Sequence, residues 1–496
     1  MGALVVSCAS APPVAPQTPN RAPAGLTTLS PQQVNEDVTL LLAVYREVHP
    51  GFDRFAADGT QRASAEAALR ALEESGTDTL TLYGAVSRWL ATLRCDHSKS
   101  EYPDAFATWR RSNPSHLPFR FITDGERLLL TVTAQVSGLS PGDEVYTVEG
   151  VPVPELIERV GAMVSVDGFT EHVIPRRFES NSDLMGSALD HYLPTLFGIR
   201  DTATVTVRRS GGELQRVTLP LIPFDGWKQL APGDYRRDFG SSVHLEFPAP
   251  GVGLLRVDTF VNYRKPVDPA ALYRTVNANL AGRGVTALII DLRNNGGGSD
   301  DAQIELQRAV ARTPFRPQRP GQWGTLDLER FSPHLTTWDP SALRPDRSKF
   351  RELPNRRFEE IPQANDPRFA MLSPSENAFA GDVILLLGPE NASGVTHLAS
   401  RLVDSGRAIV VGEATGGNAE GTHGGVLFFL TLPNSGIKTR VPAIRQFIGV
   451  DEFAPGMGIA PHYEVIPTLR ERFSGRDPAL EFALSLAVGS KPPLRP

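Results

Sequence analysis

One stretch around residue 393 constrains the fold more than any other part of the chain. An apolar run over 383–387 predicts a buried strand, and a turn over 388–391 follows it. Helical spacing then runs from Val395 to Leu402, so Ser393 lies where a buried strand gives way to a helix. Its hydroxyl suits a helix N-cap. It equally suits a nucleophile, because helix N–H groups and the helix dipole stabilise a developing oxyanion.

Composition narrows the classes of protein that this chain can belong to. At the usual domain size, 496 residues predict about three domains. Asp and Glu number 56 against 50 Lys and Arg, and no basic run stands out, so nucleic acid is not an expected partner. With only two cysteines, Cys8 and Cys95, no disulfide framework is expected.

The first 28 residues predict a leader and a linker. Residues 4–10 form a short apolar run with Cys8 among small residues, and residues 12–23 are rich in Pro, Ala and Thr. The run resembles a bacterial lipoprotein signal, in which the cysteine is lipidated, although the basic segment expected before it is missing. This interpretation places the protein in the bacterial cell envelope, on the periplasmic side, tethered through Cys8. The alternative is a plain linker tail.

Two regions precede the part of the chain that contains Ser393. Residues 29–113 show helical periodicity, with Ser30 as the predicted cap of the first helix. Residues 114–224 turn to strand patterns, with a tight Glu-Gly turn at 149–150 before a helix. This order resembles a PDZ domain, whose groove binds an added peptide strand. Residues 169–197 exceed a compact loop and predict an insertion; a generic small β domain is the alternative.

Residues 240–490 alternate strands and helices, which predicts a layered α/β domain. A Pro- and Arg-rich segment, 313–373, interrupts them without visible periodicity. It predicts a long lid or wrapping loop.

Three glycine-containing patterns occur in order. Residues 290–298 read Ile-Asp-Leu-Arg-Asn-Asn-Gly-Gly-Gly, the Ser393 stretch is followed at 412–417 by Gly-Glu-Ala-Thr-Gly-Gly, and residues 456–461 read Gly-Met-Gly-Ile-Ala-Pro. Together they resemble the tail-specific, C-terminal-processing serine peptidases and their tricorn-like branch. The resemblance implies an α/β multidomain fold, with an N-terminal helical region, a PDZ-like β domain and a ClpP/crotonase-like α/β core. It also implies a serine endopeptidase that cleaves unstructured or C-terminal polypeptide segments without a cofactor.

The family has two catalytic plans. One pairs serine with a lysine, but Asn418 stands at the position that matches this lysine. The tricorn-like plan takes a histidine from the N-terminal region, and the Asp-His-Ser sequence at 96–98 matches it. The resemblance therefore assigns Ser393 as nucleophile, through an acyl-enzyme, and His97 as its base.

The same resemblance assigns the supporting groups. The backbone N–H groups of Gly297 and Gly394 are expected to form the oxyanion hole. An acid is expected to orient the histidine. Glu452, ahead of the closing Gly-Met-Gly turn, is the preferred acid, and Asp451 and Glu420 compete with it.

Two other functions stay open on the sequence. A metal hydrolase is conceivable because His397, His423 and His462 fall in the catalytic region, but their spacing matches no standard ligand motif, and no metal is expected. A catalytically silent relative that binds peptide or lipid on the same fold is the second alternative, since a fold does not determine a function.

Overall fold

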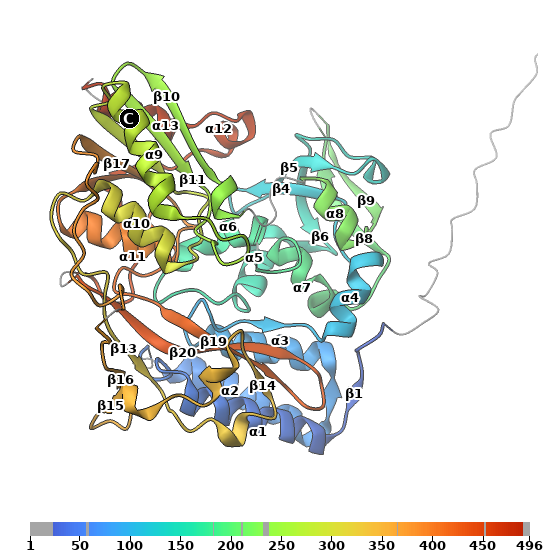
Figure 1. Ribbon diagram of the computed structural model, residues 1–496. Coiled ribbons are helices and arrows are strands. Elements are labelled where there is room, and N and C mark those ends of the chain that lie inside the picture. The colour runs from blue at the N-terminus through green and yellow to red at the C-terminus, as the bar shows by residue number, and fades with distance from the viewer. Residues whose placement is uncertain are drawn as a thin grey trace, which may run out of the picture.

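The computed structural model describes residues 23–55, 59–181, 183–209, 212–231, 238–364, 366–450 and 453–489. Three residues singled out above, Cys8, Asp451 and Glu452, lie outside this set. The described chain is a mixed α/β protein built on three larger sheets (Figure 1), which confirms the α/β class predicted from the sequence. None of its described helices combines the length and apolar character needed to cross a membrane.

The sheet that leads to Ser393 has five parallel strands and one antiparallel edge strand, β10. In spatial order it contains β10 (Val243–Ala249), β11 (Val252–Val257), β12 (Ala287–Asp291), β17 (Asp382–Leu387), β18 (Ala408–Gly412) and β21 (Tyr463–Glu464). Parallel sheets need cover on both faces. Helices α9 (Pro269–Gly282), α10 (Asp300–Val310) and α11 (Gly394–Asp404) cover one face, and α13 (Pro478–Ala487) covers the other.

Strand β12 shows how the sequence produces these layers. Leu288 and Ile290 belong to the apolar core beneath α9, α10 and α11, whereas Ile289 belongs to the core beneath α13. Successive side chains of a strand point to opposite faces. The continuous apolar run therefore fills both cores at once.

A long hairpin links this sheet to the N-terminal helices. Strands β19 (His423–Thr431) and β20 (Lys438–Ile448) cross the region of α1 (Pro31–Val48), α2 (Gly59–Ser75) and α3 (Thr79–Ala91) (Figure 1). The hydroxyl of Tyr45 donates to the carbonyl of Arg440 over 2.7 Å. Strand β3 (Ser100–Glu101) pairs with β20. The helical region is thus joined to the hairpin through both side-chain and backbone hydrogen bonds.

The segment 313–373 is more ordered than its sequence predicts. It contributes β13 (Gln318–Trp323), β14 (Leu335–Thr336), β15 (Phe350–Glu352) and β16 (Phe358–Glu360) to the sheet of the hairpin. Strand β13 pairs with β20, although its sequence includes Pro320 and Gly321 and lacks an apolar alternation. Tertiary pairing rather than local propensity makes these residues a strand.

The third sheet occupies residues 114–224 and is antiparallel. Its order is β4 (Phe119–Thr123), β5 (Leu128–Thr133), β6 (Glu144–Val148), β8 (Thr202–Arg208) and β9 (Leu214–Pro220), with β7 (Val151–Pro152) also on β6. Glu149 and Gly150 form the predicted tight turn, with φ of 52° and 77°, as a two-residue hairpin turn requires.

The segment 169–197 is helical and lies against the N-terminal region. It contains α6 (Ile174–Glu179) and α7 (Ala188–Phe197). The hydroxyl of Tyr83 on α3 lies 2.7 Å from Nε2 of His191 on α7. The remaining regular elements are β1 (Thr28–Leu29), β2 (Thr77–Asp78), α4 (Asp104–Ser112), α5 (Val153–Gly161), α8 (Phe224–Gln229) and α12 (Leu469–Ser474).

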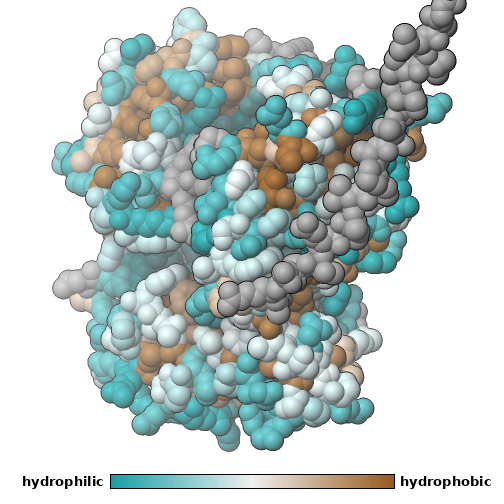
Figure 2. Space-filling model, turned by 90° about the vertical axis from the view of Figure 1, so that its right-hand side faces the viewer, coloured by the Kyte–Doolittle hydropathy of each residue, from teal (hydrophilic) through white to brown (hydrophobic). Residues whose placement is uncertain are grey.

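The surface carries no dominant apolar face on the side shown in Figure 2. Hydrophobic residues form separate patches there between hydrophilic ones. Scattered apolar residues are normal on a protein surface and indicate no particular partner.

Candidate active site

Ser393 has a strained backbone, and its hydroxyl forms no hydrogen bond with the part of the chain that the structure describes. It lies between β17 and α11 with φ of 50° and ψ of −125°. Residues other than glycine rarely adopt positive φ, and such strain costs on the order of 1–3 kcal/mol. The hydroxyl caps no helix N–H, which removes the cap interpretation. The side chain is half-buried, so it remains partly accessible.

The side chain of Asn391 fixes the turn before Ser393. Its Oδ1 accepts from the N–H of Gly388 over 2.8 Å. Its Nδ2 donates to the carbonyls of Leu292 and Asn295, over 2.5 and 2.9 Å. One buried amide therefore holds the serine turn against the glycine loop at 296–298.

The glycine loop lies directly against Ser393. A Cβ placed on Gly297 would lie 2.8 Å from the Cβ of Ser393, so only glycine fits there. The N–H of Gly297, however, donates to Oδ1 of Asn295 over 2.8 Å. The prediction that this N–H is a free oxyanion donor is therefore corrected: it already has an acceptor.

Two other N–H groups of this region have no acceptor among the described residues. They belong to Gly298 and to Gly394, the first residue of α11. The two residues are close, since a Cβ on Gly394 would lie 3.7 Å from the nitrogen of Gly298. The N–H of Gly394, which the sequence predicts as an oxyanion donor, is thus free to donate among the described residues, and so is the N–H of Gly298.

His97 lies in the loop between α3 and β3, and its tautomer follows from Thr422. The Nδ1 atom lies 3.1 Å from Oγ1 of Thr422. That hydroxyl donates its only hydrogen to the carbonyl of His423, over 3.1 Å. When the hydroxyl donates to this carbonyl, Nδ1 of His97 carries the hydrogen between His97 and Thr422. Nε2 is therefore left with a free lone pair.

The His97 ring is neutral in this setting. Burial lowers its pKa below the usual 6.5; nearby Asp96 raises it in part, and Lys99 lowers it again. A neutral imidazole with a free Nε2 is what a general base requires near neutral pH.

The loops of His97 and Ser393 converge through the buried carboxylate of Asp167. It accepts the N–H of Asn418 over 3.4 Å, and the backbone of Asp96, which precedes His97, is close enough to lower its pKa against the raising effect of burial. Gly417, next to Asn418, contacts the turn before Ser393, since its Cβ would lie 2.7 Å from Cα of Ala392. Among the described residues no hydrogen bond joins the two side chains directly. Catalytic hydrogen bonds often tighten only when substrate binds.

The acidic residues near His97 are engaged elsewhere. Asp96 pairs with Arg177 at 2.5 Å and Lys99 at 3.1 Å; burial opposes its ionisation, but these cations hold its pKa far below the usual range. Glu420 pairs with Arg54 and accepts the N–H of Gly456 over 2.8 Å. In the described structure the side chain that contacts Nδ1 of His97 is thus that of Thr422. Glu420 does not contact the imidazole.

The side chains of Asn418 and of the three candidate histidines form no hydrogen bond with the side chain of Ser393 or His97 among the described residues, although His397 and His423 lie near His97. Asn418 is buried at the position that matches the family lysine, and both polar side-chain atoms lack hydrogen-bond partners among the described residues. The histidines of the metal-hydrolase hypothesis do not cluster. His462 accepts from the N–H of Val410, whereas the ring of His423 faces His49 with centroids 4.9 Å apart.

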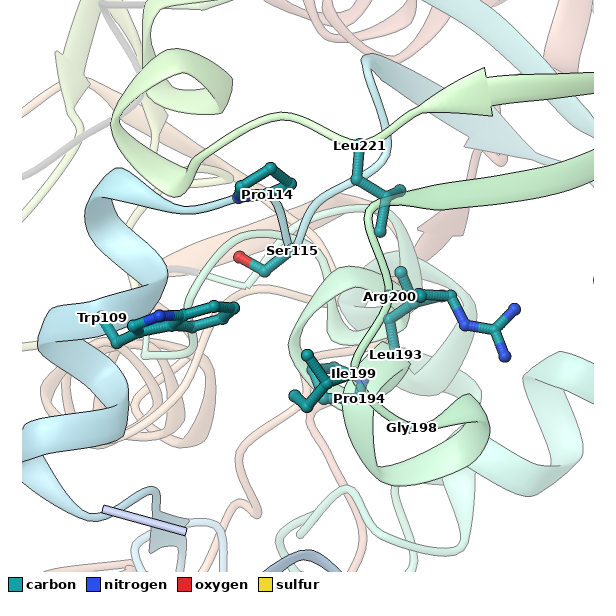
Figure 3. A pocket seen from close by; sticks show the side chains of 9 residues that line it. All are labelled: Trp109, Pro114, Ser115, Leu193, Pro194, Gly198, Ile199, Arg200 and Leu221. Carbon is teal, nitrogen blue, oxygen red and sulfur yellow. The ribbon is translucent and has the colours of Figure 1, made fainter. Parts of the chain in front are cut away.

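A pocket elsewhere in the molecule holds none of the catalytic candidates (Figure 3). It lies between α4, the end of α7 and the end of β9, and Trp109, Ser115 and Ile199 line it together with neighbouring residues. The guanidinium of Arg200 points away from its centre. The hydroxyl of Ser115 in its lining lies 2.9 Å from Nδ1 of His116, but both residues are buried, with exposed fractions of 4% and 0%.

The comparison with protein families identifies the class. Residues 251–465, which include the glycine loop and Ser393, match the model of Peptidase family S41. Residues 251–465 thus resemble the catalytic part of an S41 serine peptidase, which supports the class of peptidase and therefore of hydrolase. A search of curated proteins gives no match.

Solved structures extend the likeness to almost the whole chain. A CPAF mutant with serine replaced by alanine has a TM-score of 0.63 at 16% identity, over 93% of this chain and 98% of that one. Mature CPAF complexed with lactacystin has a TM-score of 0.60 at 16% identity, over 92% and 98% of the respective chains. At this identity the likeness concerns the fold.

Proposed function

We propose that the chain is an endopeptidase in which Ser393 attacks the peptide carbonyl and His97 acts as general base. Nε2 of His97 takes the proton from Oγ of Ser393 as Oγ bonds to the carbonyl carbon. The imidazolium then returns this proton to the leaving amine, which leaves an acyl-enzyme, and water repeats the sequence to release the acid. Thr422 keeps the hydrogen on Nδ1 throughout the first transfer.

The N–H groups of Gly298 and Gly394 serve as the oxyanion donors in this proposal. Gly394 begins α11, so its N–H also carries the positive end of the helix dipole. Such preorganised donors supply a large part of the rate enhancement in acyl transfer.

The observation that carries the proposal is the positive φ of Ser393 combined with its uncapped hydroxyl. Backbone strain that no stabilising interaction of the same residue offsets points to a functional role. Hydrolysis of a fluorogenic unstructured peptide tests it, with Ser393→Ala, His97→Ala and the double variant. We expect the hydrolysis rate of each single variant to fall by a factor of about a thousand or more, as is typical when one member of a nucleophile–base pair is removed. The rate of the double variant should be similar to those of the single variants. The exposed His244→Gln serves as the matched control.

The silent-binder alternative makes the opposite prediction. It expects that the wild type hydrolyses none of the peptides while still binding them. A peptide library digest, followed by mass spectrometry of the fragments, separates the two and also defines the cleavage preference.

We further propose that residues 114–224 act as a PDZ-like unit that receives unstructured or C-terminal segments. Their antiparallel sheet ends at β9, which pairs with β8 alone among the described strands, and an edge strand suits an added peptide strand. Deleting the unit would also remove Asp167 and Arg177, so cross-linking is the sharper test. A photoreactive C-terminal peptide on Ser393→Ala should give adducts within 114–224; adducts confined to other residues would argue against this role.

For the leader we propose lipidation at Cys8, with anchorage in the bacterial envelope facing the periplasm. The support is the apolar run ahead of this cysteine and the Pro-rich stretch after it. In cells, Cys8→Ser should move the protein from the membrane to the soluble fraction. Identical fractionation of the two forms would contradict the tether.

A further inference from the structure

Three residues from distant parts of the sequence meet beneath the His97 loop. His49 follows the last residue of α1, Cys95 lies two residues before His97, and His423 begins β19. Their exposed fractions are 1%, 0% and 0%. One potential ligand atom of each lies within 4.8 Å of those of the others. No sequence motif predicts this cluster, because its members are brought together only by the tertiary fold.

The two imidazoles of this cluster are buried without adequate hydrogen bonding. Nε2 of His49 and both ring nitrogens of His423 have no hydrogen-bond partner among the described residues. Buried polar atoms are normally paired, and each exception calls for a physical reason. Both rings are neutral, because burial lowers the pKa of His49 to about 3 and that of His423 well below its usual value. Each therefore offers a nitrogen lone pair.

We propose that His49, Cys95 and His423 bind one thiophilic transition-metal ion, with Zn²⁺ as the best match. Imidazole nitrogen and cysteine thiolate are the ligand types that zinc prefers. Bonds of about 2.0–2.3 Å in a tetrahedron require ligand atoms roughly 3.3–3.6 Å apart. The ligand atoms, which now lie within 4.8 Å of one another, therefore need to approach by about an ångström when the ion binds. Water takes the fourth position.

Binding has to displace one proton and one hydrogen bond. The Cys95 thiol gives its proton to solvent as its sulfur bonds to the metal; burial and the nearby carboxylate of Asp167 raise the pKa of the metal-free thiol to about 12. The N–H of Gly51 donates to Nδ1 of His49 over 3.1 Å, so ligation through Nε2 requires the hydrogen to move to Nδ1 and this bond to break. The loss of one neutral hydrogen bond is small against the binding free energy of a structural zinc site.

The ion would link the two segments that position His97, namely the turn that begins at Cys95 and the start of β19 at His423. Cys95 begins the turn that carries His97, and His423 follows Thr422, whose hydroxyl accepts from His97. Metal ligation at both points would fix the position of the imidazole without touching the substrate. The site is thus structural and takes no part in the acyl transfer. It is also independent of whether the chain hydrolyses peptides.

Metal content and a Co²⁺ spectrum test the proposal on the full chain, purified without a histidine tag. After exposure to Zn²⁺ and gel filtration, the wild type and His244→Gln should each retain one ion per chain. His423→Gln and Cys95→Ser should each retain little. In a Cys8→Ser background, Co²⁺ should give a thiolate charge-transfer band in the near ultraviolet, which only Cys95 can then supply.

The Co²⁺ measurement does not depend on whether the ligand variants fold, because it uses intact His49, Cys95 and His423. Absence of the charge-transfer band, or equal zinc retention by the wild type and both ligand variants, would overturn the site. Either result leaves the Ser393 and His97 activity measurements unaffected, so failure of this inference is distinct from failure of the proposed peptidase mechanism.

Discussion

The hydroxyl of Thr422 lies 3.1 Å from Nδ1 of His97 and 3.1 Å from the carbonyl oxygen of His423, so it can accept the Nδ1 hydrogen while it donates its own to the carbonyl. A neutral threonine thus occupies the orienting position that serine peptidases often fill with an acid. It holds the ring and selects the tautomer, but it adds no negative charge to stabilise the imidazolium.

Thr422→Val should lower kcat/KM while keeping the fold. The variant preserves the shape of the side chain but removes the acceptor for Nδ1–H, so the reactive tautomer and orientation are no longer enforced. One such hydrogen bond contributes on the order of 1–1.5 kcal/mol, which predicts a loss of roughly tenfold. Thr422→Ser retains the hydroxyl and should recover most of the activity. Equal activity of the valine and wild-type forms would show that Thr422 does not position the base.

Replacing Ser393 by glycine should stabilise the protein while abolishing activity. Glycine adopts a φ of 50° without strain, whereas alanine keeps the Cβ and the strain. Ser393→Gly should therefore unfold at a higher temperature than Ser393→Ala. The free energies of unfolding of the two variants should differ by on the order of 1 kcal/mol. Scanning calorimetry of the two inactive variants gives the comparison; a lower midpoint for the glycine variant would mean that the turn is not strained.

Lys438→Ala should remain active. Its Nζ pairs with the exposed carboxylate of Asp104 at 2.5 Å, at the start of β20 and away from the glycine loop. Surface ion pairs contribute little to stability. A dead Lys438→Ala, together with an active His97→Ala, would replace the histidine mechanism by a serine–lysine one.

The acid limb of kcat/KM should lie below pH 6.5. Burial lowers the pKa of His97, so the neutral, basic form persists further into acid than for an exposed histidine, and activity falls as the pH drops through that lowered pKa. Lys99 contributes to the lowering, so Lys99→Met should move the limb to higher pH. The exposed Lys265→Met is the control. A wild-type limb above pH 7 would not fit this base.

The sequence predicts some parts of this account from local pattern alone. The strand before Ser393, the helix after it and the cap at Ser30 follow from apolar spacing and capping chemistry, and the structure confirms all three. His97 could be assigned only through the family resemblance, because nearly 300 residues separate it from Ser393.

Other features depend on the tertiary fold and leave no local signal. Thr422 is an ordinary residue until the β19–β20 hairpin brings it to the His97 loop. The engaged N–H of Gly297 follows from the rotamer of Asn295, which the sequence does not specify. Strand β13 exists because β20 supplies its partner.

The most direct test of the central claim is the rate at which a fluorophosphonate labels Ser393. Peptide mapping of the wild type should place the label on Ser393 alone. The labelling rate of His97→Ala should be lower by a factor of about a thousand or more, because the nucleophile then has no base. Circular dichroism of both proteins confirms that they are folded. Labelling of another residue, or an unchanged rate in His97→Ala, would contradict the assignment of Ser393 and His97 as nucleophile and base.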